Sequence, residues 1–470
     1  MTGLHEDPGA LLPELALAVA AVAGLLAGSW LPRRRQWLVR LLGAIGCTVG
    51  IAAAVVAATG PARTVFGGSY AVDTGLAVAR VVILAGTLLV LAMAGGTLSG
   101  HRRETEFVVL LLLAALGAMV LAGTDDLLLL IAGYLLASVP LYALTAFDAD
   151  PAGTEAALKY YLIGALFGVV LMLGVAALLA AGGGTDYPTL ARTLPGAPPV
   201  LAAAGFVGVF GGLLFKAGGA PAQFWVPDVA EGAGTPVAAF VTTIPKIGAL
   251  IAAYRLLDVA VPGVAGGGLL VAAVAAGTMT LGNLAAFAQT NPRRLLAYST
   301  ISQVGYLLMA VAAAGHAALA LPGLGFYLAG YAVTNIGAFA VLAALPSATL
   351  DGHRGLFGRR PVLALALVIC LLGLVGTPPT AIFVGKLSVF TAAFDANLLW
   401  LVVVAAANTL ASLYYYLRWI VPLFQRDGAP HPTPAGRWPA AVAVTAAAGS
   451  LALGLAAEPV VHALSGHLLR

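Results

Sequence analysis

Charged residues are scarce in this chain of 470 residues. Only 9% of the residues are Asp, Glu, Lys or Arg, 61% are hydrophobic, and the mean hydropathy is +1.00. A soluble protein of this length carries about 25% charged residues and divides into about two or three domains. Long apolar runs with so few charges exclude that class. They indicate an all-α polytopic membrane protein, folded as one continuous bundle in the lipid bilayer.

Cysteines and metal-ligand spacings are also nearly absent. Cys47 and Cys370 stand alone in apolar segments, which favours buried hydrophobic side chains over a disulfide or a metal site. The histidines show no metal-like spacing, and no glycine-rich loop follows a strand. We expect no metal, haem, iron-sulfur cluster or nucleotide in this chain. The net charge of +4 comes from Arg in short connectors, so it predicts membrane orientation and not nucleic-acid binding.

Apolar runs between Gly, Pro and charged breakers predict about fourteen transmembrane helices. They lie near residues 11–30, 39–59, 76–97, 107–123, 126–147, 155–181, 199–219, 235–257, 264–287, 295–314, 318–345, 361–381, 396–421 and 438–457. The first run lacks a basic start and precedes "RRRQ", so we interpret it as a span and not as a signal peptide.

Arginines gather in the loops that follow odd-numbered spans. These are Arg33, Arg34, Arg35, Arg102, Arg103, Arg293, Arg294, Arg354, Arg359, Arg360, Arg426 and Arg437. The opposite side has only Arg63, Arg192 and Arg470. Positive loops stay in the cytoplasm, so the pattern predicts a multi-pass protein of the cell (plasma) membrane with both termini on the outer side.

The four lysines are the unusual charges. Every Lys lies in or at the mouth of an apolar segment: Lys159, Lys216, Lys246 and Lys386. A guanidinium stays protonated, whereas an ammonium moved out of water can lose its proton. The pattern predicts a proton relay at Lys216, Lys246 and Lys386. Snorkelling or a structural ion pair is the alternative, most of all for Lys159, which is close to a loop.

Two of these lysines lie beside predicted helix breaks. "FKAGGAP" (215–221) places two glycines and a proline after Lys216, and "GTPPTAIFVGK" (376–386) places two prolines before Lys386. Broken backbone at membrane depth is tolerated only where protein or a water-filled cavity replaces the lost hydrogen bonds. Two interrupted spans five helices apart predict inverted five-helix repeats, helices 4–8 and 9–13, each with a broken helix.

Other polar residues near the lysines leave two interpretations open. Asp228 and Glu231, between the seventh and eighth spans, either admit protons or cap the eighth helix. The strip from Tyr298 to Gln303 in "YSTISQ" either orders water or hydrogen-bonds neighbouring helices.

Six stretches carry a resemblance to a known family. They are "EAALKYYLIGA", "FKAGGAPAQFWVPDVAEGAGTPVAAF", "PKIGAL", "NPRRLLAYSTISQVGYLLM", "YAVTNIGAFAV" and "GTPPTAIFVGKLSVF". Their order and spacing resemble the antiporter-like membrane subunits of respiratory complex I, the proton-translocating NADH:quinone oxidoreductase of bacteria. The Lys in "PKIGAL" favours subunit N, since the sister subunits L and M resemble one another in having a His there.

The resemblance implies a proton channel driven by electron transfer in other subunits. Lys216 would titrate with a Glu on helix five, Lys246 would connect the two halves, and Lys386 would exchange protons with the outer side. NADH, FMN, iron-sulfur clusters and quinone would bind partner subunits. The implied partners of this chain are other membrane-arm subunits, lipid, protons and internal water.

The sequence departs from the family pattern at helix five. The alignment of "GYLLASVPLY" (133–142) places Leu135 where the paired glutamate is expected, and Gln303 and Gln223 replace expected histidines. Carboxylates near the ends of neighbouring spans are possible substitutes if the fold brings one close: Asp125, Asp126, Asp148 and Glu155.

Two other functions stay open. A stand-alone cation/proton antiporter would need a carboxylate cage for its cation, and this interior is poor in carboxylates. A structural subunit with an inactive channel is suggested by Leu135. In every case we interpret the chain as one membrane domain, divided into helices 1–4 (1–123), helices 5–8 (124–258), helices 9–13 (259–421) and a C-terminal loop with helix 14 (422–470); the first repeat covers about 107–258.

Overall fold

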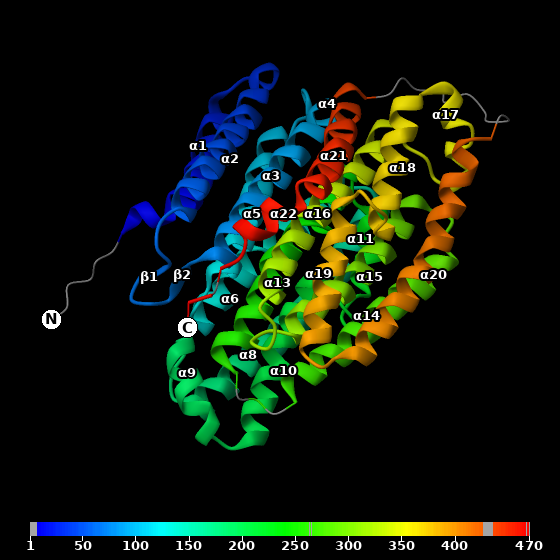
Figure 1. Ribbon diagram of the computed structural model, residues 1–470. Coiled ribbons are helices and arrows are strands. Elements are labelled where there is room, and N and C mark those ends of the chain that lie inside the picture. Colours follow the sequence, from blue (N-terminus) through cyan, green and yellow to red (C-terminus); the bar gives the residue numbers. More distant parts are fainter. Residues whose placement is uncertain (1–6, 263, 265, 426–435, 467, 470) are drawn as a thin grey trace.

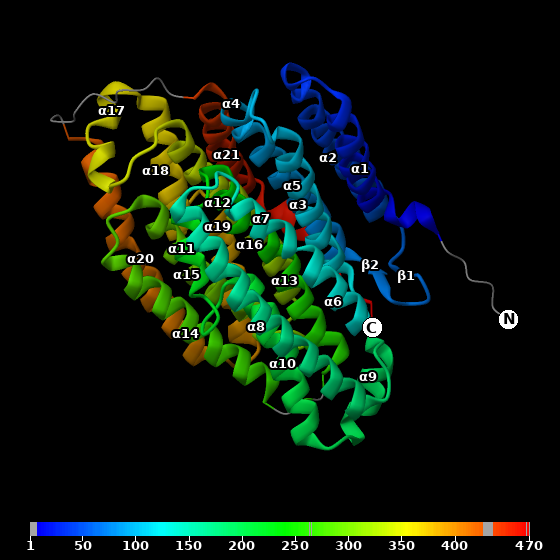
Figure 2. The same cartoon turned by 180° about the vertical axis from the view of Figure 1, so that it is seen from behind.

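The protein is a bundle of membrane helices with one small β-hairpin, shown from opposite sides in Figures 1 and 2. The computed structural model describes residues 7–262, 264, 266–425, 436–466, 468 and 469. Among these residues, 13 helical segments are long and apolar enough to cross a membrane. The shorter apolar helix α18 (Pro361–Val375), continued by α19 (Ala381–Asp395), supplies one more span. The predicted fold class is confirmed.

Three spans precede the first repeat. A short turn η1 (Pro8–Leu11) leads into α1, and η2 (Arg33–Arg35) joins α1 to α2 at one edge of the bundle (Figure 1). The helices are α1 (Leu12–Trp30), α2 (Trp37–Ala58), α3 (Thr74–Met93) and the short α4 (Gly95–Leu98). Between α2 and α3, β1 (Arg63–Val65) pairs antiparallel with β2 (Tyr70–Val72). Strands of this length are too short to show alternation, so the sequence pattern did not predict them.

Five spans make up each repeat. The first contains α5 (Glu104–Gly123), α6 (Leu127–Leu136), α7 (Val139–Thr145), α8 (Pro151–Gly182), α10 (Pro199–Ala217), α11 (Trp225–Gly232), α12 (Thr235–Val241) and α13 (Ile244–Arg255), which ends in the π-helical turn η4 (Leu256–Ala260). The second contains α14 (Gly267–Phe287), α15 (Pro292–Ala312), α16 (Ala320–Ala344), α18, α19 and α20 (Leu399–Leu423).

The remaining elements are connectors and the last span. Between α8 and α10 lie α9 (Tyr187–Thr193) and η3 (Leu194–Gly196); between α16 and α18 lie η5 (Leu350–His353) and α17 (Leu356–Arg359). The chain closes with α21 (Arg437–Leu455) and α22 (Ala457–Ala463). Successive spans cross in alternate directions, so spans five positions apart run oppositely. The two repeats are therefore inverted, and each has a broken fourth span.

Two of the predicted spans are not continuous. The fifth, predicted over 126–147, is divided into α6 and α7 at Ala137 and Ser138. The eighth, predicted over 235–257, is divided into α12 and α13 at Thr242 and Thr243. Neither break contains clusters of Gly and Pro like those at the predicted breaks after Lys216 and before Lys386. Instead, a single proline follows each break by two residues and lies in the first turn of the next helix, where its missing N–H costs no hydrogen bond.

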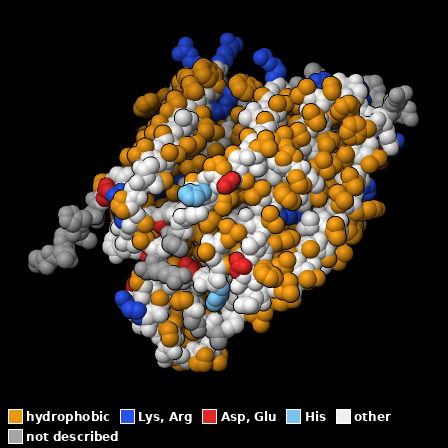
Figure 3. Space-filling view, viewed as in Figure 1, with side chains coloured by type: hydrophobic (Ala, Val, Ile, Leu, Met, Phe, Trp, Pro, Cys, Tyr) orange, Lys and Arg blue, Asp and Glu red, His pale blue; other side chains and the backbone are white. Residues whose placement is uncertain are grey.

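The inner and outer helices differ in burial. The α12–α13 span is wholly buried and α15 nearly so, whereas only about a third of the residues in α1, α2 and α8 are buried. Figure 3 shows this hydrophobic wall, with Lys and Arg side chains gathered along its upper edge. In water such a wall would be unstable, so it is the surface that lipid or neighbouring subunits cover.

Both described ends of the chain lie on the side of the hairpin. Asp7 forms an ion pair with Arg63 of β1 at 3.0 Å, and the Leu469 amide donates to Asp73, just after β2, at 3.2 Å. The arginine loops η2 and α17 lie at the opposite end of the bundle (Figure 1). Of the predicted cytoplasmic and outer arginines, Arg426 and Arg470 fall outside the described residues.

Two buried ion pairs hold the first spans to the bundle. Arg80 of α3 binds Glu14 of α1 at 2.6 Å, and the Tyr70 hydroxyl donates to the same carboxylate at 2.7 Å. Arg255 of α13 binds Asp73 at 2.8 Å with both side chains fully buried. Each guanidinium neutralises a carboxylate that would otherwise be buried alone at high cost.

Candidate functional site

Three lysine side chains end at the broken helices of the bundle. Lys216, Lys246 and Lys386 are all buried, and the ammonium group of each donates a hydrogen bond to a backbone carbonyl that a helix break leaves free. The last carbonyls of a helix have no intrahelical donor and carry partial negative charge, so they attract a cation. The fold thus places each predicted relay lysine at such a carbonyl.

Lys216 reaches the break in the fifth span. Its Nζ donates to the carbonyl of Ala137 at 3.2 Å and to the hydroxyl of Ser138, and it lies 5.2 Å from the centroid of the Tyr134 ring. The sequence analysis missed Ser138. A serine two residues before a proline in an apolar run, as in "ASVP", is the signal that marks this break.

Lys246 reaches the break in the seventh span. It donates to the carbonyl of Ala217, the residue next to Lys216, and lies 5.8 Å from the Trp225 ring centroid. Gly218 follows with a φ of +78°, and a β-carbon there would lie 2.8 Å from the Lys246 Nζ. Only glycine accommodates both the left-handed backbone and the close ammonium. Lys246 therefore binds the carbonyl of the residue that directly follows Lys216 in the chain.

Lys386 repeats this arrangement in the second half. Its Nζ donates to the carbonyl of Val375, the last residue of α18, at 2.9 Å and to Thr409 of α20 at 3.4 Å. Gly376 follows with a φ of +87°, and its missing side chain leaves room for the Lys386 stem. The aromatic face of Tyr306 lies 4.0 Å from the ammonium.

Within the described residues, none of the three ammonium groups lies within ion-pair distance of a carboxylate. Their partners are carbonyls, hydroxyls and aromatic rings, which stabilise a cation less than a carboxylate does. Loss of a proton from such a lysine would leave no buried carboxylate unpaired, which is the arrangement that a proton relay requires.

Hydrogen-bonded polar side chains lie on the helices between the break that precedes Lys246 and the break beside Lys386. Near Lys246, the Asn335 amide donates to Thr242 and Thr243 at the break in the eighth span, at 3.1 and 2.8 Å. The Tyr331 hydroxyl contacts the Thr242 carbonyl at 2.8 Å and the Thr300 hydroxyl at 3.0 Å. These side chains join α13 to α15 across the core of the bundle.

The second part of this connection runs from α15 to the break beside Lys386. Gln303 donates to the carbonyl of Leu374 at 2.8 Å and accepts from the Tyr327 hydroxyl at 2.5 Å. Leu374 directly precedes Val375, so Gln303 and Lys386 bind consecutive carbonyls of the same helix end. Gln303 thus hydrogen-bonds neighbouring helices, one of the two interpretations given for this strip. Tyr298, on the same helix, is only half-buried and lies toward Arg294 instead.

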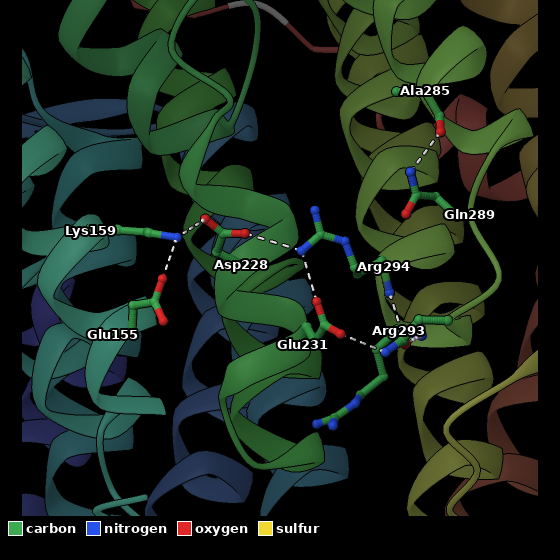
Figure 4. Close-up of polar contacts among 9 residues, drawn as sticks. Glu155, Lys159, Asp228, Glu231, Ala285, Gln289, Arg293 and Arg294 are labelled. Carbon is green, nitrogen blue, oxygen red and sulfur yellow. Dashed lines mark hydrogen bonds and ion pairs between the residues drawn. The ribbon is translucent and has the colours of Figure 1, made fainter. Parts of the chain in front are cut away.

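The accessory charges form a separate cluster near the arginine loops (Figure 4). Lys159 of α8 binds Glu155 at 2.8 Å and Asp228 of α11 at 3.1 Å. Arg294 of α15 binds Asp228 at 3.1 Å and Glu231 at 2.8 Å. The capping interpretation for Asp228 and Glu231 is wrong, because Gly234 begins α12 without any side-chain cap. These residues instead tie three helices together by ion pairs.

None of the four possible substitutes for the missing glutamate lies at Lys216. Asp126 caps α6 by accepting from the amides of Leu128 and Leu129, and Glu155 is engaged by Lys159. Asp148 lies beside Gly234 in the connectors near the arginine loops. Leu135 itself is 42% exposed, so its side chain lies on the outside of this chain. The hypothesis of a carboxylate substitute is wrong because the break at Ser138 brings backbone and hydroxyl oxygens to the ammonium.

Asp125 belongs to a cluster on the hairpin side, outside the spans. It lies beside Asp73, Arg255 and Asp186, and burial raises its pKa to about 6 although Arg255 opposes the shift. In contrast, hydrogen bonds from Thr189 lower the pKa of Asp186. In the part of the chain that the structure describes, no three His, Cys, Asp or Glu side chains are placed to hold a metal ion.

Known proteins share this architecture. A sequence model of the family described as "NADH:quinone oxidoreductase/Mrp antiporter, TM" matches residues 124–412. A chain of Streptomyces griseus named NADH-quinone oxidoreductase subunit N 1 is 55% identical over 98% of both chains. A chain of a Mycobacterium species (strain JLS) named NADH-quinone oxidoreductase subunit N is 53% identical, over 96% of this chain and 97% of the relative.

Solved structures agree with these sequence relatives. A chain of respiratory complex I from Thermus thermophilus is 34% identical, with a TM-score of 0.84 over 97% of this chain and 100% of that one. A chain of the Mrp complex from a Dietzia species has a TM-score of 0.86 at 23% identity, over 97% of this chain and 96% of that one. At that identity the second match shows a common fold.

Proposed function

Because the chain belongs to the NADH:quinone oxidoreductase/Mrp antiporter transmembrane family, we propose that it moves protons across the membrane through Lys216, Lys246 and Lys386. It is an antiporter-like membrane subunit of a respiratory complex, of the subunit N type, and its partners are the other membrane-arm subunits. The resemblance on which the sequence analysis relied is thereby confirmed.

The proposal that the three lysines form a proton relay rests on one observation. Three ammonium groups lie at freed helix carbonyls, without a carboxylate partner among the described residues, and hydrogen-bonded polar side chains lie on the helices between the second and the third. Charging one lysine raises the free energy of its charged neighbours, because charges interact strongly at low effective dielectric. A proton gained at Lys216 therefore favours proton loss from Lys246, and the change continues to Lys386.

In this mechanism the reaction chemistry lies elsewhere in the complex. Electron transfer from NADH to quinone, with FMN, iron-sulfur clusters and quinone, takes place in partner subunits. This chain contributes the translocase part of the enzyme. The energy of electron transfer reaches it as movement or charge change at the contact with its neighbour.

The orientation follows from the charges of the connectors. The arginine loops face the cytoplasm and the hairpin side faces outward, as the positive-inside rule requires for a protein of the bacterial plasma membrane. Both termini then lie outside. Lys386 releases its proton to that side. The ion pairs of Lys159, Glu155, Asp228 and Glu231 lie at the cytoplasmic mouth of the first half, where protons arrive.

The experiment compares the assembled complex in sealed vesicles, with proton pumping and electron-transfer rate recorded together. Lys216→Met removes the titrating group, and Ser138→Ala removes only its hydroxyl partner. We expect Ser138→Ala to slow the coupled rate roughly tenfold, because the lost hydrogen bond to a charged group is worth about 1.5 kcal/mol. Thr145→Val is the control, because the Thr145 hydroxyl bonds its own helix at Leu141 and not Lys216.

A structural subunit with an inactive channel is the second candidate, favoured by the exposed Leu135. If it were correct, Lys216→Met and Ser138→Ala would pump as wild type in a fully assembled complex. Leu135→Glu adds a test of the missing partner. Because Leu135 lies on the outside of the chain, we expect the new carboxylate to act at the contact with a neighbour and to change pumping less than Ser138→Ala does.

A further inference from the structure

An open groove lies between the first two membrane helices, which form one edge of the bundle (Figures 1 and 2). Its volume is about 520 Å³, and hydrophobic side chains line it. Ala27, Trp30 and Leu31 line it from the end of α1, and residues from Leu38 to Ile45 line it from the beginning of α2. This stretch of α2 covers two helical turns, so the groove is about 10 Å long.

Two tryptophans indicate the depth of the groove in the bilayer. Trp30 is the last residue of α1 and Trp37 is the first residue of α2, and their exposed fractions are 89% and 46%. Exposed Trp side chains of membrane proteins gather at the level of the lipid headgroups. The connector between α1 and α2 therefore lies at headgroup level, and the groove lies directly below it, at the depth of the acyl chains.

Three consecutive arginines lie at the headgroup end of the groove. Arg33, Arg34 and Arg35 make up η2, and all three are exposed. Leu31 and Leu38, which line the groove, flank this connector on either side. Figure 3 shows Lys and Arg side chains that project from this end of the helix pair. None of the three arginines forms an ion pair with a residue that the structure describes.

An anionic phospholipid has the chemistry that both parts of this site require. Guanidinium groups bind phosphate oxygens through paired hydrogen bonds, and basic sites between membrane helices on the cytoplasmic side bind anionic headgroups. An acyl chain of the same molecule would cover the hydrophobic side chains. A helix of a neighbouring subunit would have to bring carboxylates to three arginines as well. Arg40 of α2 shows the contrast, because Glu104 of this chain already binds it at 3.2 Å.

We propose that the groove between α1 and α2 binds one anionic phospholipid, with its phosphate at Arg33, Arg34 and Arg35 and an acyl chain along the groove. Only about a third of the residues in α1 and α2 are buried by the chain itself, so the lipid completes the packing of this edge of the bundle. The inference goes beyond the proposed function and depends on no step of the proton relay.

The test uses the assembled complex in vesicles of phosphatidylcholine that contain a small share of phosphatidylglycerol with a photoreactive acyl chain. Irradiation attaches the chain to residues beside it, and mass spectrometry of the peptides locates the attachment. Phosphatidylcholine with the same photoreactive chain, at the same share, is the probe without net charge. We expect the anionic probe to label residues 27–45 about fivefold more than the neutral probe, because one arginine near an anionic headgroup contributes about that factor.

Variants of η2 test the role of the arginines. The triple variant Arg33→Gln, Arg34→Gln and Arg35→Gln should lose the preference for the anionic probe. Replacement of the same three residues by lysine should keep most of it, because the positive charge remains. Arg192→Gln is the control, since Arg192 is exposed on α9 at the hairpin side. Equal labelling by both probes in wild type would mean that no headgroup is recognised and would overturn the inference.

A second pair of variants tests the groove itself. Ala27→Phe fills the groove and leaves the arginines in place, so we expect less labelling of Leu38 and Ile45 by the anionic probe. Val22→Phe is the matched control, because Val22 of α1 is 59% exposed and does not line the groove. If neither probe labels the groove in the wild-type complex, a neighbouring subunit covers it and the inference is wrong. Proton pumping is not the readout, so none of these outcomes bears on the proposed relay.

Discussion

The ammonium group of each proposed relay lysine binds a backbone carbonyl and not a carboxylate, so its positive charge is not neutralised by a full negative charge. At the fully buried pair of Arg255 and Asp73, in contrast, a guanidinium and a carboxylate neutralise each other. Lys216 and Lys386 meet only partial negative charges. The buried arginines thus meet carboxylates, whereas the lysines for which we propose a relay do not.

Gly218 leaves the space in which the Lys246 ammonium reaches the carbonyl of Ala217. In Gly218→Ala the new β-carbon would meet the Lys246 Nζ at 2.8 Å, on a backbone with φ +78°. We expect a loss of stability of about 1–2 kcal/mol from the backbone alone, and lower pumping because Lys246 is displaced. Pumping and thermal unfolding of the assembled complex measure both.

The control is Gly277→Ala, in α14, where a β-carbon meets no atom within 4 Å. Alanine is the better helix former, so this variant should be as stable as wild type or slightly more so. Equal behaviour of the two variants would show that the close approach at Gly218 has no importance.

Asp125 makes stability depend on pH at the hairpin side. Burial raises its pKa from 3.8 to about 6, so the folded chain binds this proton more tightly than the unfolded chain. The stabilising contribution is complete below about pH 4 and is lost as the pH rises through about 6, on the order of 2 kcal/mol. Thermal unfolding at pH 4.5 and 6.5 should show this fall in wild type and a smaller one in Asp125→Asn. An unchanged difference in the variant would assign the pH dependence to another group.

At the scale of elements, helix breaks present free carbonyls to the lysines, whereas ion pairs hold helices together. Four spans are interrupted, and three of the interruptions present the carbonyls that the lysines bind. Ion pairs hold helices whose apolar faces alone would not fix their position in lipid, where no hydrophobic force selects one helix neighbour over another. α1 and α3 depend on such a pair.

Arg80→Leu leaves the carboxylate of Glu14 buried without its cation. We expect a loss of about 3–5 kcal/mol, seen as weaker attachment of α1 and α2 and less assembled complex. The double variant Arg80→Met with Glu14→Leu removes both charges and should regain most of the stability. The yield and melting temperature of the purified complex measure this. A double variant as unstable as Arg80→Leu would mean that the pair supplies more than charge balance.

At the scale of the whole molecule, charge and apolar surface together set the position in the membrane. The bundle has an apolar wall, arginine connectors at one end, and the hairpin with both described chain ends at the other (Figures 1 and 3). Spans of alternating direction place the two inverted repeats around the same buried core, α12–α13 and α15. The relay that we propose would therefore run through the middle of the bundle, from one repeat to the other.

Thiol labelling tests the orientation. The two native cysteines are buried, so labelling without an added cysteine should be low. A membrane-impermeant reagent should label Gly67→Cys, in the hairpin turn, on intact cells and Gly358→Cys, in α17, only in inside-out vesicles. A β-carbon at either glycine meets no atom within 4 Å, although Gly67 has a φ of +64°. The reverse pattern would place the arginine loops outside.

The sequence by itself determined the membrane class, the number of spans, the lysines and the breaks at "FKAGGAP" and "GTPPTA". Each of these is a local property: the apolar content of a run, the rarity of a charge, or the missing amide of proline. The family resemblance followed from the same local motifs. The breaks at Ser138 and Thr242 were not predicted, because a single proline also occurs at the start of continuous helices, whereas the other two breaks have clusters of Gly and Pro.

Only the tertiary structure decided which groups each lysine meets. Ala137, Ala217 and Val375 are ordinary apolar residues, and their carbonyls become partners only because a break in one helix lies against a side chain from another. The same holds for Glu14 with Arg80 and for His353 with Trp419, which are separated by 66 residues in each case. Backbone carbonyls occur at every position, so no sequence pattern distinguishes those left free. Packing of the bundle selects them.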